Sequence, residues 1–496
     1  MRHALSSTQN RQIKIIELLR TTNSYVSVKK IAKIVDAVPK TIVNDCQEIE
    51  ERWNAILQIE RNTSGDLHLS EKHNHTVREV FSDILKESPT FQLLEILFFQ
   101  PGKLRTELEK ELFLSSSSLY RRIVKLNEGL KMRGLQIDRN NLMLTGTNEL
   151  QVRLFMAAYF LEVYDVYEWP FQLDQKVVWT TVNQIDRHFD LKLNFLQKAE
   201  LSFLIAVSII RQQQGFLNSG KRDLSSEKTL LYETLITELL SSFSLPITEL
   251  VKKDLIQTIF WYDFSWDNLA EEDRIERFSD NIIDLIVNAL GITISNESRK
   301  NCISLFKTVY NSYKTYPYET YIAYNRQLYN SLTIQRDFAV FSKVLEKTLK
   351  DQESKTRFPW YTMYYHLILF ELFIYWEDLP KQLDQLRRPV LTEVCSDLGP
   401  KHAQLLAYYL NKNFHDKLLL DIQSEKIYAE VAADSLVSDL YVTNFSTPII
   451  PEERLFVLED VPSIKSLAAL GRKIDDFRMN TLIKQPVSYT HLRAHE

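Results

Sequence analysis

The sequence predicts a mostly α-helical, multidomain protein. Its 496 residues exceed what one hydrophobic core normally organises, and its 10 glycines are too few for a protein built on glycine-rich nucleotide-binding loops. Most of the chain also repeats apolar residues with the period of a helix. Near the N-terminus, two short helices followed by a hairpin are predicted twice in succession, the order of elements in a winged helix-turn-helix.

The first winged helix-turn-helix is expected over residues 1–71. A helix from Gln9 to Thr21 precedes a short helix at 28–35, and Pro39 suits the first turn of a third helix. The wing is predicted by apolar alternation in two segments, 56–59 and 67–69.

The third helix of this domain is the predicted recognition helix. Its buried stripe would consist of Ile42, Cys46, Ile49 and Trp53. The face left over carries polar side chains that can reach base edges or phosphates, so the candidate DNA contacts are Lys40, Thr41 and Asn44.

The second winged helix-turn-helix is expected over 72–165 and centres on the segment SSSSLYRRIVKLNEGL. Leucine and isoleucine recur at helical spacing in Leu119, Ile123, Leu126 and Leu130, which predicts one buried and one basic face. Serines at the helix start can cap it and present N–H groups to a phosphate. The candidate DNA contacts are Ser116, Ser117, Tyr120, Arg121, Arg122 and Lys125.

A plainer interpretation is two packed helices and a hairpin, with Arg121 and Arg122 on a solvated face. Recurrence of the same order of elements upstream favours the DNA-binding interpretation. The charge distribution agrees with it, because residues 1–153 hold 23 Lys and Arg against 19 Asp and Glu, whereas the rest holds 37 against 46. This basic excess is modest, so DNA binding would depend on local patches and on dimerisation.

Composition indicates an ordinary soluble protein, with 45% hydrophobic and 25% charged residues. The longest apolar run, 203–210, is too short to cross a bilayer, and residues 1–20 lack a signal-peptide core, so we expect a cytoplasmic protein with no membrane segment. Its three cysteines lie far apart, which predicts free thiols and no metal site. Motifs of nucleotide-binding and hydrolytic enzymes are absent from the sequence, so neither a cofactor nor an enzyme activity is expected.

Beyond the second wing, two helical bundles are expected over 166–291 and 292–388, followed by a small parallel α/β domain over 389–480. Helices are predicted in nine apolar runs: 173–189, 195–214, 227–243, 247–262, 274–290, 297–315, 318–333, 335–350 and 359–376. Residues 484–496 have a polar, patternless character that is typical of a non-native tail.

The sequence resembles the Mga/AtxA family of transcriptional regulators. The resemblance is carried by SVKKIAKIV and PKTIVNDCQEI, by SSSSLYRRIVKLNEGL, and by LMLTGTNELQVRLFMAAYFLEVYDVYEWPF. It covers the chain in domain order and implies a DNA-binding regulator, an activator by family type. Because one winged helix reads only a few base pairs and the basic excess is small, we expect the working species to be a homodimer. A contact through the C-terminal half is expected, with dimerisation through the N-terminal domains as the alternative.

The resemblance also implies that the bundles are phosphotransferase-system regulation domains and that the last domain is IIB-like. Phosphocarrier proteins of that system would then be partners, and the candidate phosphoacceptors are His188, His366 and Cys395. His366 is favoured over His188 because its helix is otherwise apolar, although a structural role competes for both. In the first bundle Leu204 stands where the family has a histidine, and the loop after Cys395 lacks the glycine and hydroxyl content of a phosphate cradle.

Two other functions remain open from the sequence. An RNA-binding antiterminator has similar regulatory bundles, but it would need a short β-rich module at the N-terminus, where residues 1–70 are predicted to be helical. A IIB-type phosphoryl-transfer protein would depend on Cys395 alone.

Overall fold

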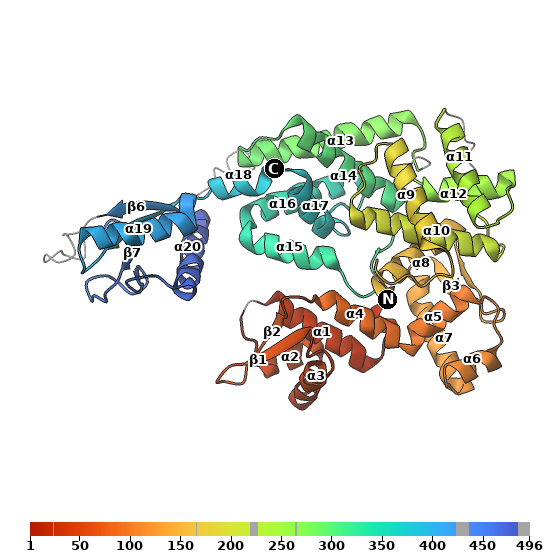
Figure 1. Ribbon diagram of the computed structural model, residues 1–496, viewed down its shortest axis with the longest axis horizontal. Coiled ribbons are helices and arrows are strands. Elements are labelled where there is room, and N and C mark those ends of the chain that lie inside the picture. The colour runs from red at the N-terminus through yellow and green to blue at the C-terminus, as the bar shows by residue number, and fades with distance from the viewer. Residues whose placement is uncertain (23, 165, 219–226, 263–264, 423–435, 485–496) are drawn as a thin grey trace. The chain divides into compact units, whose positions relative to one another are not determined.

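The computed structural model describes residues 1–22, 24–164, 166–218, 227–262, 265–422 and 436–484 (Figure 1). The chain forms two compact units, which are described separately. The first comprises residues 1–284 with 299–372, and the second comprises 285–298 with the chain from residue 373 onward. Helices dominate the first unit, whereas the second contains a small parallel sheet, so the predicted fold class is confirmed.

The first winged helix-turn-helix has the predicted order of elements, preceded by a short 3-10 helix, η1 (Arg2–Ala4). It comprises α1 (Ser7–Thr21), α2 (Val28–Val35), α3 (Pro39–Arg52), β1 (Leu57–Arg61) and β2 (Leu67–Glu71). Asp36 ends α2 in the left-handed conformation, at a φ of 56°. The two strands pair antiparallel with Ile59 opposite Leu69, which turns the apolar side chains of both strands onto the core.

The second winged helix-turn-helix repeats this plan after two additional helices. Its elements are α4 (Val77–Glu87), α5 (Pro89–Phe99), α6 (Arg105–Glu111), α7 (Ser116–Lys131), β3 (Leu135–Ile137) and β4 (Leu144–Gly146). All four residues of the predicted stripe on α7 are at most 2% exposed, so that prediction is correct.

Helices make up the rest of the first unit. They are α8 (Glu149–Tyr164), α9 (Gln175–His188), α10 (Phe195–Gln213), α11 (Glu227–Ser242), α12 (Glu249–Ile259), α13 (Leu269–Leu290), α14 (Asn296–Thr315), α15 (Arg326–Asp337), α16 (Ala339–Thr356) and α17 (Tyr365–Tyr375); α13, α14 and α17 extend into the second unit. Their order agrees with the predicted runs, but boundaries shift by several residues.

The largest difference is at 318–333, where the helix begins only at Arg326. The preceding residues are irregular because the Glu162 carboxylate accepts the backbone N–H groups of Ile322, Ala323 and Tyr324, each at 2.7 Å. Pro317 lies just before this segment, and Asn325 caps α15 through the N–H of Leu328. A carboxylate distant in sequence therefore binds the backbone of a segment that the local periodicity had predicted to be helical.

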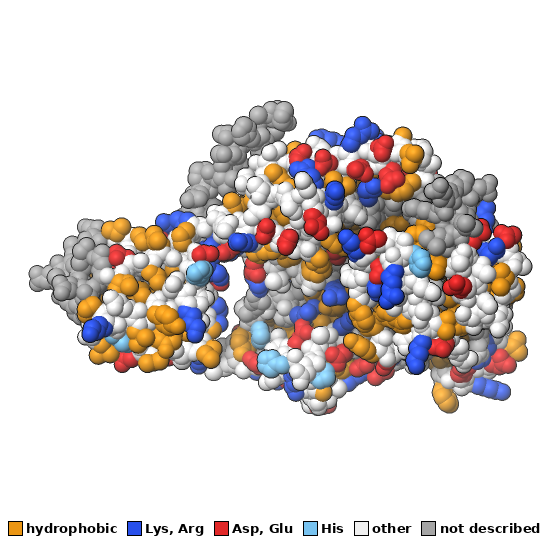
Figure 2. All heavy atoms as spheres, turned by 45° about the horizontal axis from the view of Figure 1, so that its top comes forward, with side chains coloured by type: hydrophobic (Ala, Val, Ile, Leu, Met, Phe, Trp, Pro, Cys, Tyr) orange, Lys and Arg blue, Asp and Glu red, His pale blue; other side chains and the backbone are white. Residues whose placement is uncertain are grey.

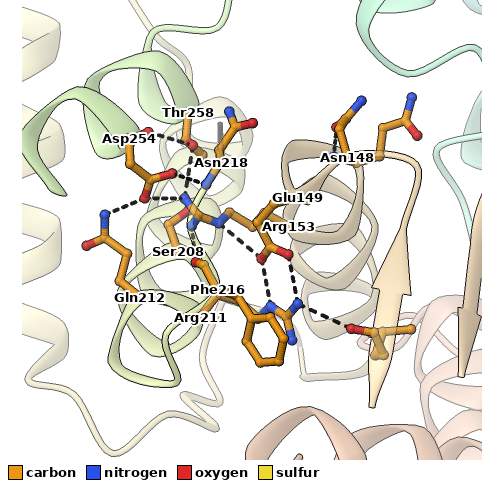
Figure 3. Close-up of polar contacts among 12 residues, drawn as sticks. Asn148, Glu149, Arg153, Ser208, Arg211, Gln212, Phe216, Asn218, Asp254 and Thr258 are labelled. Carbon is orange, nitrogen blue, oxygen red and sulfur yellow. Dashed lines mark hydrogen bonds and ion pairs between the residues drawn. The ribbon is translucent and has the colours of Figure 1, made fainter. Parts of the chain in front are cut away.

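A buried ionic network joins the second wing to the helices after it (Figure 3). Glu149, at the start of α8, receives two hydrogen bonds from Arg211 of α10, and Arg211 also donates to the Leu144 carbonyl of β4. Arg153 of α8 pairs with Asp254 of α12 at 3.0 Å. Two cations and two anions are thus buried together, and their charges cancel.

The second unit contains α18 (Leu379–Gln385) and the predicted α/β domain. Its elements are β5 (Val390–Cys395), α19 (Pro400–Phe414), β6 (Leu418–Ile422), β7 (Leu440–Thr443), β8 (Leu455–Val457) and α20 (Ile464–Lys484). The strands lie in the order β6-β5-β7-β8 and every pair is parallel, as the alternation of strands and helices predicts. Of the predicted tail, everything from residue 485 lies outside the described residues.

Candidate nucleic-acid interface

The start of α7 is capped and open to solvent. Ser115 is the N-cap, and its hydroxyl accepts the N–H of Ser118 at 3.3 Å. Because the first N–H groups of a helix have no partner within it, this end carries partial positive charge and favours an anion.

Four of the six candidate DNA contacts on α7 are exposed: Ser116, Ser117, Tyr120 and Arg121. The hydroxyl of Ser116 donates to the Glu109 carboxylate of α6, which ties the two helices of the motif together. Among the residues that the structure describes, Arg121 makes only a long contact, at 3.4 Å, with the hydroxyl of Ser118. Its guanidinium therefore keeps most of its donors for a ligand.

Arg122 and Lys125 lie on a different side of α7, and both are half-buried. Nη1 of Arg122 lies 3.4 Å from the hydroxyl of Thr90 in α5, whereas Nζ of Lys125 donates to the carbonyl of Leu5 at 2.6 Å. These two predicted contacts thus face the residues around η1 and α5, away from Tyr120.

On α3 the candidates Lys40 and Asn44 are exposed and Thr41 is half-buried. The opposite side of the helix is fixed by Asp45, which is 3% exposed and accepts hydrogen bonds from Arg11 of α1, one of them at 2.9 Å. This paired carboxylate holds α3 against α1 and leaves the candidate side chains facing solvent.

The second wing contributes a residue that sequence reasoning missed. The guanidinium of Arg139, in the turn between β3 and β4, lies 5.8 Å from the centre of the Tyr120 ring. Arg105 of α6 donates to the carbonyl of Arg139. The sequence showed a cation in the turn of the wing, but only the fold places this cation beside the ring of Tyr120 on α7.

The two candidate phosphoacceptor histidines differ in exposure. His188 is exposed at the end of α9, and its Nδ1 donates to the Gln184 carbonyl at 2.7 Å, which leaves Nε2 as the basic nitrogen. His366 of α17 is half-buried, and its Nδ1 lies 2.7 Å from the Ser331 hydroxyl. Burial lowers the pKa of the His366 imidazole.

Cys395 ends β5, as predicted for a IIB-like strand, but its side chain is fully buried. Burial, with the Glu393 carboxylate beside it, raises the pKa of the thiol to about 12. In the loop that follows, the Ser396 hydroxyl contacts Nδ1 of His402 at 2.7 Å and accepts the N–H of Leu398 at 3.0 Å. A phosphate would have to compete with these bonds, and the thiolate it would need is disfavoured.

Within the described part of the chain, His, Cys, Asp and Glu form no group of three that could hold a metal ion. None of the helices in these same residues combines the length and the apolar character needed to cross a membrane.

Paired winged helices, each with a polar and exposed face on its recognition helix, define a DNA-binding regulator. Residues 73–160 match the family of the Mga helix-turn-helix domain. This region contains α7 and both strands of the second wing.

Similarity to known proteins extends beyond residues 73–160. A Streptococcus pneumoniae serotype 4 protein described as a trans-acting regulator is 20% identical over 95% of this chain and 98% of its own length. The capsule synthesis positive regulators AcpB and AcpA of Bacillus anthracis are 27% and 24% identical, each over 42% of this chain and 43% of the relative. These matches confirm the predicted resemblance to the Mga/AtxA family and support a transcriptional regulator of that type.

Proposed function

We propose that the protein activates transcription by inserting α7, and with it α3, into the major groove of DNA. The observation that carries this proposal is the division of each recognition helix into a buried apolar stripe and an exposed polar face that begins at the helix N-terminus. Capsule regulators similar to this chain are named as positive regulators, which favours activation. Binding to chromosomal DNA would place the protein in the cytoplasm.

Removal of one cation from each helix tests the proposal. We expect Lys40→Ala/Arg121→Ala to weaken binding to a mixed-sequence duplex and to lower the salt slope by about two, one for each lost phosphate contact. A matched control, Arg277→Ala/Lys347→Ala, removes the same two charges from exposed sites on α13 and α16. Equal affinity and slope for both double variants would refute the assignment of these helices to DNA.

Genome-wide mapping of bound fragments would identify the targets, and competition with single-stranded RNA separates DNA binding from antitermination. The described part of residues 1–71 contains three α-helices, one short 3-10 helix and one two-stranded wing, which does not fit the β-rich module expected of an antiterminator. Phosphoryl transfer by Cys395 is disfavoured by its burial, so we propose a regulator without enzyme activity.

The working species is a homodimer in this proposal, held through the second unit. Its α/β domain exposes many apolar side chains (Figure 2), among them Leu398, Tyr408, Leu419, Val461 and Ile464. Exposed apolar surface of this kind favours a protein contact. Two chains would double the phosphate contacts and read two half-sites together.

Sedimentation of the full chain tests the dimer. We expect Tyr408→Glu/Leu419→Glu to sediment as a monomer at concentrations at which the wild type is a dimer. The control Ile247→Glu/Leu250→Glu alters two exposed apolar residues of the first unit and should remain dimeric. The opposite pattern would place the dimer contact in the first unit.

Regulation by the phosphotransferase system is proposed on the two histidines, with phosphocarrier proteins as partners. Exposure of His188 favours its modification, whereas phosphorylation of His366 would add close to two negative charges to a half-buried site and disturb the packing of α17. Mass spectrometry after incubation with phosphocarrier proteins tests both positions, and the absence of phosphohistidine at each would reject the proposal.

A further inference from the structure

A surface cavity of about 220 Å³ lies beside α7, on the side turned away from Tyr120. Its walls come from three separate parts of the first unit: the residues around η1 and the start of α1, the start of α5, and the part of α7 between Ser118 and Lys125. The lining residues are Ala4, Ser6, Thr90, Ser118, Arg121, Arg122 and Lys125. A water molecule occupies about 30 Å³ in the liquid, so the cavity has room for a group of several atoms.

Three of the seven lining residues are cations, and none is a carboxylate. Throughout the described ranges, Arg121, Arg122 and Lys125 form no ion pair with an acidic side chain. Other cations at the junctions of this unit are paired, as Arg11 is with Asp45 and Arg153 with Asp254. Three neighbouring positive charges without a counter-ion repel one another, and an anion would relieve that repulsion.

Arg122 is the clearest case of a cation in this cavity that lacks a counter-ion. Its Nε is buried and has no hydrogen-bond partner in the described structure, and its contact with the Thr90 hydroxyl is long, at 3.4 Å. Burial lowers the pKa of the guanidinium, and no carboxylate opposes that effect. A partly desolvated cation without a counter-ion is unfavourable in the free protein, so this arrangement points to a ligand.

Donors around the cavity suit a phosphate group. Lys125 donates one of its three N–H groups to the Leu5 carbonyl, which leaves two for a ligand. The Thr90 hydroxyl can donate its proton into the cavity, since its described contact is as an acceptor from Arg122. Guanidinium groups bind phosphate oxygens in a planar, bidentate manner, and a phosphate carries enough charge to balance more than one cation.

We propose that this cavity is a binding site for a phosphate group, held by Arg122, Lys125 and the hydroxyl of Thr90. The phosphate is either a backbone phosphate of bound DNA or a free phosphate ion or monoester. The first source rests on the proposed function, whereas the second does not. In both cases the ligand connects the N-terminal segment of the chain with α7, so its occupancy would stabilise the position of the recognition helix.

The test uses the full chain in four forms: wild type, Arg122→Gln, Thr90→Val, and Lys131→Gln as the control. Lys131 is an exposed cation at the other end of α7, so the control removes the same charge from the same helix. Binding of inorganic phosphate is measured by ³¹P NMR at constant ionic strength with chloride as the replacement anion. Affinity for a mixed-sequence duplex is measured over a range of salt concentrations.

We expect Arg122→Gln to weaken phosphate binding by about tenfold to hundredfold, the effect of losing a hydrogen bond to a charged group, and Lys131→Gln to leave it unchanged. Thr90→Val should weaken it less, because it removes a neutral donor. If the natural occupant is a DNA phosphate, Arg122→Gln also lowers the salt slope of DNA binding by about one. If the occupant is a free phosphate, the slope stays at the wild-type value.

The proposal is overturned if Arg122→Gln and Thr90→Val both match the wild type in phosphate binding and in salt slope. A purely structural role for Arg122 would instead lower the melting temperature, whereas our proposal expects the free Arg122→Gln variant to be as stable as the wild type or more so. Loss of DNA binding in Lys40→Ala/Arg121→Ala without any effect of Arg122→Gln would leave the proposed function in place and remove the cavity site. Phosphate binding that depends on Arg122, in a protein that binds no DNA, would keep the cavity site and remove the proposed function.

Discussion

The guanidinium of Arg211 forms two hydrogen bonds of 2.7 Å, from Nε and Nη2, with the two carboxylate oxygens of Glu149. Arg211 is fully buried, and the side chain of Glu149 is 10% exposed. Since Arg211 also donates to the Leu144 carbonyl in the second wing, this ion pair fixes the wing to α8 and α10. It is a direct connection between the DNA-binding region and the helices that follow it.

Loss of the Glu149 charge should destabilise the protein strongly. We expect Glu149→Gln to lower the free energy of unfolding by about 3 kcal/mol, because it leaves a buried guanidinium without its counter-ion. Urea denaturation measures the change. The control Glu249→Gln alters an exposed carboxylate that pairs with Lys252, where we expect an effect within about 0.5 kcal/mol. A loss below about 1 kcal/mol for Glu149→Gln would mean that water or the remaining polar groups replace the pair.

Phe113 lies in the turn between α6 and α7 with a φ of 52° and a side chain that is 95% exposed. A left-handed conformation is unfavourable for any residue with a Cβ. We therefore expect Phe113→Gly to be about 1 kcal/mol more stable than Phe113→Ala, since both remove the ring and only glycine relieves the backbone. Thermal unfolding of the two variants measures the difference, and equal stability would show that the turn adapts to alanine at no cost.

The three cysteines should resist alkylation in the native protein. Burial raises the pKa of the thiols of Cys46, Cys302 and Cys395 to about 12, so thiolate is scarce near neutral pH. We expect iodoacetamide to leave all three unmodified in mild buffer and to modify all three in urea, as read by mass spectrometry. Rapid native labelling of Cys395 alone would instead indicate a chemical role for this thiol in the α/β domain.

His366 should make stability depend on pH in the mildly acidic range. Because burial lowers the pKa of the folded imidazole, the unfolded chain binds a proton more readily. Stability contributed by neutral His366 is thus present above the unfolded pKa of about 6.5 and is lost as the pH falls below it. We expect His366→Gln to lose less stability than the wild type between about pH 7 and pH 5. The exposed His188→Gln serves as the control; identical pH profiles for both variants would contradict the prediction.

Local pattern was sufficient for most of the fold. Apolar residues at helical spacing predicted the stripe of α7, Pro39 marked the first turn of α3, and alternation predicted both wings. The parallel sheet followed from the order of strands and helices alone. Each of these features is encoded within a few turns of chain, where side-chain periodicity must match backbone geometry.

Only the tertiary structure decided how the chain uses the charges on those elements. Arg121 and Arg122 are neighbours in sequence, yet one is exposed and the other faces Thr90, because a helix turns about 100° for each residue. No local pattern places Thr90 or Leu5 beside α7, or Glu162 beneath residues 322–324. Sequence alone thus determined which segments form α3 and α7, since that information is local. Which cations lie free for a ligand depended on packing between residues far apart in the chain.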